Sequence, residues 1–295
     1  MRISGFTFIR NGSLLNYPFI ESIRSALPVC DEFVVAVGAG EDDTRERIVA
    51  IGDPKIRIVD TVWNPVLHKK GFVLAQQKMI AQYNCTGDWA FYIEGDEVLH
   101  EDDADALKRS MERHFDDPRV EALWFDYVHF YGDVNWQAIG HSFYRREVRV
   151  IRNTLRTTTT DSLYFLVLDK KKRGRYPRAA SAEARLFHYG NARSPIPMWE
   201  KRRQMNRLYE GRGIDPTPEN VNRQHTYSMD GRLVKRFEGS HPAVMAEWIA
   251  TQEGDPYVPN QGGYVNNRDR RNIIGLKIQP FLPFDIGKKH FKSVR

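Results

Sequence analysis

The first hundred residues of this 295-residue chain alternate between short apolar runs and amphipathic stretches, and this alternation constrains the fold more than any other feature. The apolar runs have the length of strands and cover residues 3–9, 33–37, 56–59 and 89–93. The stretches between them carry apolar residues at helical spacing and cover residues 17–27, 43–51 and 71–83. Strands and helices in alternation imply right-handed crossovers, and therefore a mainly parallel central sheet flanked by helices. We predict an α/β fold.

The pattern changes after residue 117. Residues 120–130, 143–151 and 185–189 have the composition of strands, and a helix is expected at residues 198–209. From residue 211 the chain is rich in Gly, Pro, Asn and charge, with one convincing helix at residues 242–251. We therefore predict one domain over residues 1–210 and a helical or irregular C-terminal appendage, residues 211–295, packed on it.

An acidic turn is the most informative segment for function. In parallel sheets ligands bind beyond the carboxyl ends of the strands, and the strand at 89–93 runs directly into Glu94-Gly95-Asp96-Glu97. Carboxylate oxygens are the ligands that Mg²⁺ and Mn²⁺ prefer. Because Glu94 and Asp96 are two residues apart, both can point to one side of an extended chain. We predict that they face a common site and that Asp96 is an exposed acid at the end of the sheet; an acidic turn that caps the next helix is the alternative.

The loop Gly38-Ala39-Gly40-Glu41-Asp42-Asp43 follows a strand and opens a helix, as a dinucleotide-binding loop does. Its chemistry is wrong for that role, because Asp43 replaces the third glycine and three successive carboxylates would repel a pyrophosphate. The sequence therefore argues against nicotinamide or flavin binding. A simple helix cap by Asp42 or Asp43 is the alternative interpretation of the acids.

Charge is distributed unevenly along the chain. Residues 88–117 carry a net charge of −8, and residues 141–213 carry a net charge of +12. An acidic centre followed by a basic stretch suits a metal beside a diphosphate or polyanion, and two solvated faces are the alternative. The run from Lys170 to Arg175 is either a solvated loop or a contact for the phosphates of an acceptor at a membrane surface. Nucleic acid is not expected, since no recognised reader motif is present.

Several protein classes are excluded. The longest apolar runs have about 5 to 8 residues, far fewer than the roughly 18 needed to span a bilayer. Cys30 and Cys85 cannot form a disulfide framework or a four-ligand zinc site. The first ten residues have the pattern of a strand and not of a signal peptide. We expect a cytoplasmic protein, with peripheral contact at the inner membrane face as a further expectation.

The order of these motifs resembles glycosyltransferase family 2. Its elements are Arg10-Asn11 after the first strand, Gly40-Glu41-Asp42-Asp43-Thr44 after the second, Thr86-Gly87-Asp88-Trp89, and the acidic turn. Later segments resemble the bacterial branch that builds lipopolysaccharide cores and related surface glycans: residues 148–152, Thr160-Asp161, Phe187-His188-Tyr189 and Lys201. The resemblance covers residues 1–210 and implies the GT-A fold, an α/β nucleotide-binding domain.

The chain departs from the family pattern at specific positions. Glu94 stands where the metal motif has its first Asp, and Gly40 stands in the position of a Ser. Val37 and Gly38 fall where many members carry an Asp pair that contacts the base. These departures leave the nucleotide open, and they leave a degenerate, noncatalytic relative as an alternative.

The resemblance implies a metal-dependent, inverting transfer of a sugar from a nucleotide-sugar donor to a glycan or lipid-linked acceptor. It implies Mn²⁺ or Mg²⁺ bound by Asp96, by Glu94 directly or through water, and by His188. His188 could instead contact the diphosphate, and a histidine packed in a strand is the alternative for it. The donor contacts it implies are Arg10, Asn11, Asp42, Thr44, Lys70 and Asp96. In an inverting transfer a carboxylate removes the acceptor's proton; Asp161 is the first choice for this base and Asp133 the second, with a plain turn residue as the alternative for each.

Two other functions remain open. A nucleotidyltransferase could share the sheet and the acidic turn, but it should carry a basic, glycine-rich loop after the first strand, and Arg10-Asn11-Gly12-Ser13 is only a faint version of one. A noncatalytic protein that binds anionic glycans or nucleic acid could use the basic stretch, and its binding would need no metal and would depend steeply on salt.

Overall fold

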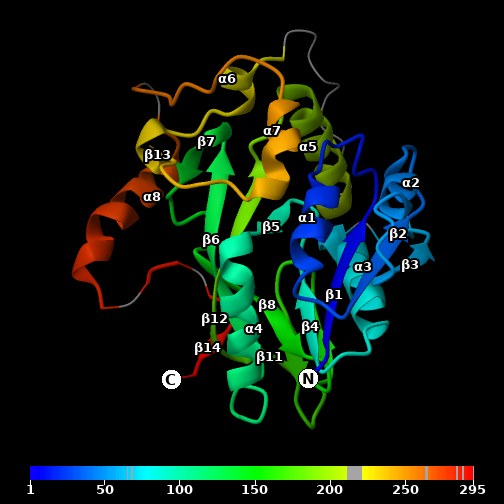
Figure 1. Ribbon diagram of the computed structural model, residues 1–295. Coiled ribbons are helices and arrows are strands. Elements are labelled where there is room, and N and C mark those ends of the chain that lie inside the picture. The colour runs from blue at the N-terminus through cyan, green and yellow to red at the C-terminus, as the bar shows by residue number, and fades with distance from the viewer. Residues whose placement is uncertain are drawn as a thin grey trace.

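The computed structural model describes residues 1–64, 66–67, 69–210, 221–262, 265–283, 285–287 and 289–294 (Figure 1). The predicted alternation is confirmed in the N-terminal half, where four parallel strands lie in the order β3-β2-β1-β4. These strands are β1 (Ile3–Ile9), β2 (Glu32–Gly38), β3 (Ile56–Thr61) and β4 (Trp89–Tyr92). The helices between them are α1 (Phe19–Ala26), α2 (Thr44–Val49) and α3 (Phe72–Tyr83).

The sheet continues beyond β4 with antiparallel strands. In spatial order these are β8 (Arg146–Arg152), β6 (Ala122–Tyr131), β7 (Asp133–Ala138) and β13 (Val234–Arg236). The long strand β12 (Arg178–Asn191) contains the strand predicted at 185–189 and runs parallel to β6 and antiparallel to β5 (Glu97–Leu99). Its register places His188 opposite Glu97 on one side and opposite His129 on the other. The predicted α/β fold, a central sheet flanked by helices, is confirmed.

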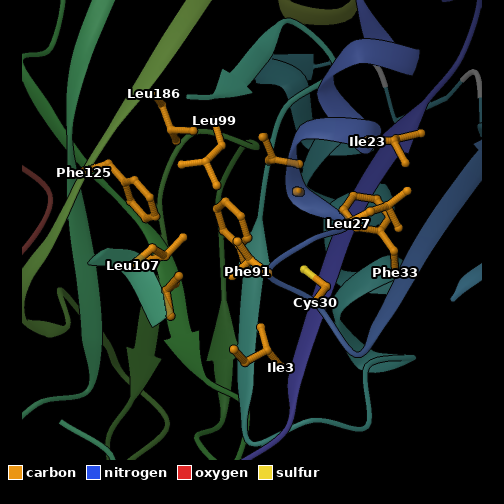
Figure 2. Packing of buried hydrophobic residues seen from close by; sticks show 14 of the residues in the cluster. Ile3, Ile23, Leu27, Cys30, Phe33, Phe91, Leu99, Leu107, Phe125 and Leu186 are labelled. Atoms are coloured by element: carbon orange, nitrogen blue, oxygen red, sulfur yellow. The ribbon is translucent and has the colours of Figure 1, made fainter. Parts of the chain in front are cut away.

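Helices and a small sheet cover the two faces of the central sheet. Side chains of β2 alternate between the faces, with Phe33 on one and Val34 on the other, as expected of a strand buried on both sides. On the first face, Figure 2 shows Ile23 of α1 and Leu107 of α4 (Ala104–Arg113) on either side of Phe91. The second face is covered by α3 and by the three strands β9 (Thr157–Thr158), β10 (Leu166–Leu168) and β11 (Gly174–Arg175).

The C-terminal part contacts the sheet at several points. Helix α5 (Pro195–Glu210) confirms the helix predicted at 198–209, and its prolines lie in the first turn, where no amide donor is lost. After the undescribed residues 211–220 come α6 (Arg223–Thr226), α7 (Ala246–Ala250) and α8 (Asn267–Ile278). The short strand β14 (Lys292–Ser293) pairs with β12. The division into a domain and an appendage at residue 210 stays a prediction.

One expectation for this region is wrong. The helix predicted at 242–251 is present as a 3-10 turn followed by α7, but it is not the only convincing one. Helix α8 has twelve residues, and the residues it buries are Asp269, Asn272 and Gly275. Because its inner face is polar, the sequence lacks the apolar period that identifies a core-facing helix. No helix among the described residues is both long enough and apolar enough to cross a bilayer.

Candidate active site

A pocket of about 160 Å³ opens at the carboxyl ends of β1 and β4, where α3 and α5 approach the sheet. We call it the central pocket. Its polar lining residues are Arg10, Glu94, Asp96, Ser162, His188 and Lys201, together with Gln204 of α5. The acidic turn, the late histidine and the lysine that the sequence singled out therefore meet in one place, as expected for the ligand edge of such a sheet.

The third carboxylate of the turn, Glu97, has a structural role, because it accepts hydrogen bonds from two other strands. Its side chain is fully buried, and Arg149 donates to both of its oxygens, at 2.9 Å and 2.7 Å. Tyr127 donates its hydroxyl to the same carboxylate at 2.8 Å. Arg149 reaches further, to Glu94 at 3.2 Å and to the carbonyl of Leu163 at 2.7 Å. A single buried guanidinium thus ties the acidic turn to the loop that follows residue 160.

Glu94 is the carboxylate whose charge is least compensated. Burial, together with the negative charge of Glu97, raises the pKa of Glu94 to about 8, although Arg149 opposes the shift. At neutral pH the protein by itself therefore favours a proton on Glu94. An additional positive charge in the central pocket would favour the ionised form instead.

Asp96 behaves in the opposite way. Its Oδ2 accepts hydrogen bonds from Arg193 at 2.6 Å and from Lys201 at 3.0 Å. Burial alone would raise the pKa of Asp96, but the Lys201 ammonium and the Arg193 guanidinium hold it well below its usual range. The expectation of an exposed acid is wrong, because Asp96 is only 4% exposed and its partner Arg193 is fully buried.

The contact between two histidines determines which ring nitrogen in the central pocket is unprotonated. Nε2 of His129 lies 2.7 Å from the carbonyl of Tyr144, which can only accept, so this nitrogen carries the proton. Burial lowers the pKa of both His129 and His188, so both rings are neutral at neutral pH. Nδ1 of His129 is then the acceptor for Nδ1–H of His188, 3.1 Å away. This assignment leaves Nε2 of His188 with a free lone pair.

The free ligand atoms fit a divalent cation. Nε2 of His188 faces Oδ1 of Asp96 at 3.6 Å, and neither atom has a proton to offer the other. Ligand atoms of Glu94, Glu97 and His188 all lie within 4.8 Å of one another, but both oxygens of Glu97 are already used. Glu94 and His188 of this group keep free lone pairs, and Oδ1 of Asp96 lies beside His188, although Asp96 is outside the group of ligand atoms that lie within 4.8 Å of one another. The carboxylate oxygens suit Mn²⁺ or Mg²⁺, and the imidazole, whose other nitrogen is hydrogen-bonded, favours a transition metal such as Mn²⁺ over Mg²⁺.

Replacing Gly190 by Ala should disturb this arrangement. A Cβ at position 190 would lie 2.5 Å from Cε1 of His188 and 2.9 Å from Oδ2 of Asp96, so one of them must move. We expect Gly190→Ala to weaken Mn²⁺ binding at least tenfold, a loss comparable to that on removing an outer partner of a metal ligand. Titration calorimetry with Mn²⁺ measures this, with Gly52→Ala, whose Cβ would meet nothing within 4 Å, as a test of general strain. Equal affinities of Gly190→Ala and wild type would contradict the assignment.

The predicted donor contacts are divided between the pocket and its supporting loops. Arg10 lines the central pocket and lies 5.5 Å from the ring centre of Trp63. Asn11 accepts the amide of Glu41, and Thr44 Oγ1 accepts the amide of Gly12 and donates to Asp42. Asn11, Asp42 and Thr44 therefore join the loop after β1 to the loop after β2 and do not line the central pocket. Asp42 and Thr44 line a separate hollow next to β3.

Asp161 and Lys70 lie together beside the central pocket. They line a neighbouring hollow with Thr160 and Tyr209, and the next residue, Ser162, lines the central pocket itself. The fully buried Lys78 of α3 donates to the carbonyls of Ser162 at 2.9 Å and Tyr164 at 3.2 Å. Lys78 and Arg149 therefore fix the loop that carries Asp161.

Asp133 is separated from both pockets. Its carboxylate accepts the amides of Asn135 at 2.8 Å and Tyr257 at 2.9 Å, and it lines neither the central pocket nor the hollow beside it. These contacts are those of a turn residue. The basic run 170–175 covers the turn after β10 and β11 itself and lines neither pocket. Arg173 pairs with Asp169 at 3.1 Å, and Arg175 pairs with Glu121 at 2.6 Å.

Four residues of the site were not predicted from the sequence pattern: Arg149, His129, Lys78 and Arg193. One signal was available: Arg149 is flanked by Val148 and Val150, and His129 by Val128 and Phe130, and a polar residue between apolar neighbours in a strand indicates a buried partner. Their partners follow only from strand register. Lys78 and Arg193 carried no comparable signal.

No protein-family model and no curated protein matches this sequence. Among solved structures, S. aureus TarS 1–349 in complex with UDP-GlcNAc aligns with 70% of this chain and 65% of its own, at 13% identity and a TM-score of 0.41. The longer S. aureus TarS aligns with 70% of this chain, at 12% identity and a TM-score of 0.39, and this chain spans only 39% of its length. Glucosyl-3-phosphoglycerate synthase from Mycobacterium tuberculosis, in complex with Mn²⁺, UDP and glucosyl-3-phosphoglycerate, aligns over 44% of this chain and 45% of its own, at 22% identity and a TM-score of 0.30. These structures align with only part of this chain, at low identity and with TM-scores below 0.5. The function of this chain is therefore inferred from its own residues.

Proposed function

We propose that this protein is a metal-dependent, inverting glycosyltransferase that moves a sugar from a nucleotide-sugar donor to a glycan or lipid-linked acceptor. The observation that carries the proposal is the set of open donors in the central pocket. Glu94, Asp96 Oδ1 and the bare Nε2 of His188 lie at the ligand edge of an α/β sheet, with the Lys201 ammonium beside them. The order of the motifs, which resembles that of glycosyltransferase family 2, also implies a divalent cation that binds the diphosphate of a nucleotide-sugar.

The diphosphate of the donor is proposed to bind between these groups. A divalent cation, when bound by Glu94, Asp96 and His188, supplies positive charge that neutralises the leaving diphosphate. Lys201 adds a fixed positive charge, because its ammonium is held by Asp96 and by the carbonyl of Gly190 at 3.0 Å. Arg10 lines the same pocket next to Trp63 and is placed to contact the nucleotide.

The acceptor is proposed to enter through the hollow that contains Asp161. Its carboxylate lies one residue from Ser162 of the central pocket, so a hydroxyl between the two pockets can lose its proton to Asp161. Lys78 and Arg149 both hold this loop, and Arg149 also contacts Glu94. The base and the metal ligand are thereby fixed relative to each other, which is the alignment that transfer requires.

The alternative nucleotidyltransferase is less well supported. Such an enzyme needs free backbone amides in the loop after β1 to hold phosphates. Here the amides of Gly12 and Ser13 are taken by Thr44 Oγ1, at 2.7 Å and 3.4 Å, and the amide of Leu14 is taken by Asp42. The second alternative, a noncatalytic polyanion-binding protein, differs from our proposal in that its binding needs no metal.

A panel of nucleoside diphosphates tests the proposal by thermal unfolding with and without Mn²⁺. We expect one of them to raise the unfolding temperature in the presence of Mn²⁺, since a ligand at a hundred times its Kd stabilises the folded state by about 2.7 kcal/mol. Stabilisation that is independent of the metal and lost at high salt would favour the noncatalytic alternative. No stabilisation by any member of the panel would reject the proposal.

The effect of Mn²⁺ should depend on pH through Glu94. Its pKa is about 8 in the folded protein and 4.5 in the unfolded chain, so the folded state keeps a proton that the unfolded state loses. Without metal, Glu94 therefore lowers the free energy of unfolding as pH rises from 4.5 to about 8. Mn²⁺ must displace this proton, so its stabilising effect should grow over the same range.

Denaturant unfolding of wild type and Glu94→Gln across this range measures the difference. The Gln variant keeps the shape but has no proton to lose, so its stability should not follow this trend, and other titrating groups cancel in the comparison. Parallel pH profiles of the two proteins, with and without Mn²⁺, would show that Glu94 is not the titrating ligand.

A further inference from the structure

The C-terminal helix α8 and the turn after it expose large apolar side chains to solvent. Ile274, Ile278 and Phe281 are 53%, 47% and 85% exposed. They are four and three residues apart, at the end of α8 and in the 3-10 turn Gln279–Phe281 that continues it, so they lie on one side of the helix. We call these three residues the outer stripe. Figure 1 shows α8 at the edge of the molecule, on the side away from α2 and β3.

The buried residues of α8 are Asp269, Asn272 and Gly275, with Ile273 and Leu276 partly buried beside them. Asn272 accepts the amide of Ser142 at 2.7 Å and donates to its hydroxyl at 2.6 Å. Asp269 accepts the amide of Asp230, and Gly275 packs closely on His141. The helix is therefore held by hydrogen bonds on its inner side. Among the described residues, about half of Ile274 and of Ile278 and most of Phe281 stay open to solvent, whereas an ordinary surface helix turns its apolar side to the core.

Basic residues flank the outer stripe. On a helical projection Arg270, Arg271 and Lys277 fall within about 60° of Ile274, and all three are exposed. Residues 267–295 carry eight Lys and Arg against two Asp, a net charge of +6, which equals the net charge of the whole chain. The other 266 residues are therefore neutral overall. Long-range attraction to an anionic surface would orient the molecule with this segment toward it.

We propose that the outer stripe and its basic flank dock this protein on an anionic lipid surface. Apolar side chains between cationic ones match the boundary between acyl chains and negative headgroups. A second copy of the chain does not fit, because facing stripes would bring two strongly positive segments together. A nucleic acid backbone would leave the apolar side chains against phosphates. The proposal does not depend on the enzymatic function, although the start of α8 lines a pocket that His188 also borders.

Vesicle co-sedimentation of the full chain tests the docking without nucleotide or metal. We expect binding to vesicles of phosphatidylcholine mixed with phosphatidylglycerol, no binding to phosphatidylcholine alone, and weaker binding at high salt. The triple variant Ile274→Ser, Ile278→Ser, Phe281→Ser should lose binding. The triple variant Arg270→Gln, Arg271→Gln, Lys277→Gln should bind about a hundredfold more weakly.

Matched controls separate this surface from general charge and exposure. Val49→Ser with Val258→Ser changes two other exposed apolar residues, 52% and 63% exposed, and should bind like wild type. Lys170→Gln, Lys171→Gln, Lys172→Gln removes three charges elsewhere and should do the same. Unchanged circular dichroism and unfolding temperature check that each variant is folded. The proposal is overturned if wild type does not bind the anionic vesicles or if both α8 variants still bind them fully. It is also overturned if vesicle binding is lost in the variant Lys170→Gln, Lys171→Gln, Lys172→Gln.

Discussion

Replacing Asp161 by Asn lowers turnover by about a hundredfold or more, while nucleoside diphosphate binding survives. The substitution preserves the shape of the side chain and removes only the proton acceptor. The surrounding loop should stay in place, because Lys78 and Arg149 hold it and the amide oxygen of Asn can still accept the backbone amide of Leu163, which Oδ1 of Asp161 accepts at 2.8 Å. Steady-state kinetics with a nucleotide-sugar and an authentic acceptor measure the loss, and calorimetry checks donor binding.

Asp133→Asn is the matched control for this experiment. Asp133 was the second candidate for the base, but its carboxylate accepts two backbone amides in a turn away from the central pocket. We expect this variant to keep turnover within a few-fold of wild type. Normal turnover of Asp161→Asn would exclude Asp161 as the base, and a large loss in Asp133→Asn would transfer the role to that residue.

Asp96→Ala destabilises the protein by about 3–5 kcal/mol, the usual cost of removing one partner of a buried ion pair. The loss leaves the guanidinium of Arg193 buried and without its partner, and it also releases Lys201. Urea unfolding measures the change. The exposed Asp102, with a side chain 73% exposed, supplies the control Asp102→Ala, which should stay within about 0.5 kcal/mol of wild type.

A second variant separates ion pairing from other effects at this position. If the cost comes from an unpaired guanidinium, then Asp96→Ala combined with Arg193→Met should recover part of the lost stability, because the buried charge is removed. The structural account of Asp96 would be wrong if Asp96→Ala unfolded within 1 kcal/mol of wild type. It would also be wrong if the double variant lost the sum of the two single changes.

The parallel half of the fold could be predicted from sequence because each element there has a clear period. Strands such as β2 are apolar after their first residue, and helices such as α1 bury one apolar side, so alternation and length suffice. Helix α8 could not be found in this way, because its buried side carries Asp269 and Asn272. Its partners, Ser142 and Asp230, are distant in sequence, so only the folded chain shows why it is stable.

The site was predictable where it depends on strand ends and not where it depends on register. Glu94 and Asp96 follow β4 directly, so their place at the ligand edge could be inferred. The free nitrogen of His188 could not, because it follows from the pairing of β12 with β6 that brings His129 alongside. The loop residues Asp42 and Thr44 were predicted to contact the donor, but their atoms are used to join two loops.

The most direct test of the account is calorimetric titration of the best-stabilising nucleoside diphosphate into wild type and Glu94→Gln, each with Mn²⁺ and with a chelator. The account predicts binding of one nucleotide per chain in wild type with Mn²⁺. It predicts an affinity at least tenfold lower, a difference of about 1.4 kcal/mol, when either the metal or the Glu94 carboxylate is absent. Equal affinities under all four conditions would contradict it, since the diphosphate would then be held by Lys201 and its neighbours without a metal at Glu94.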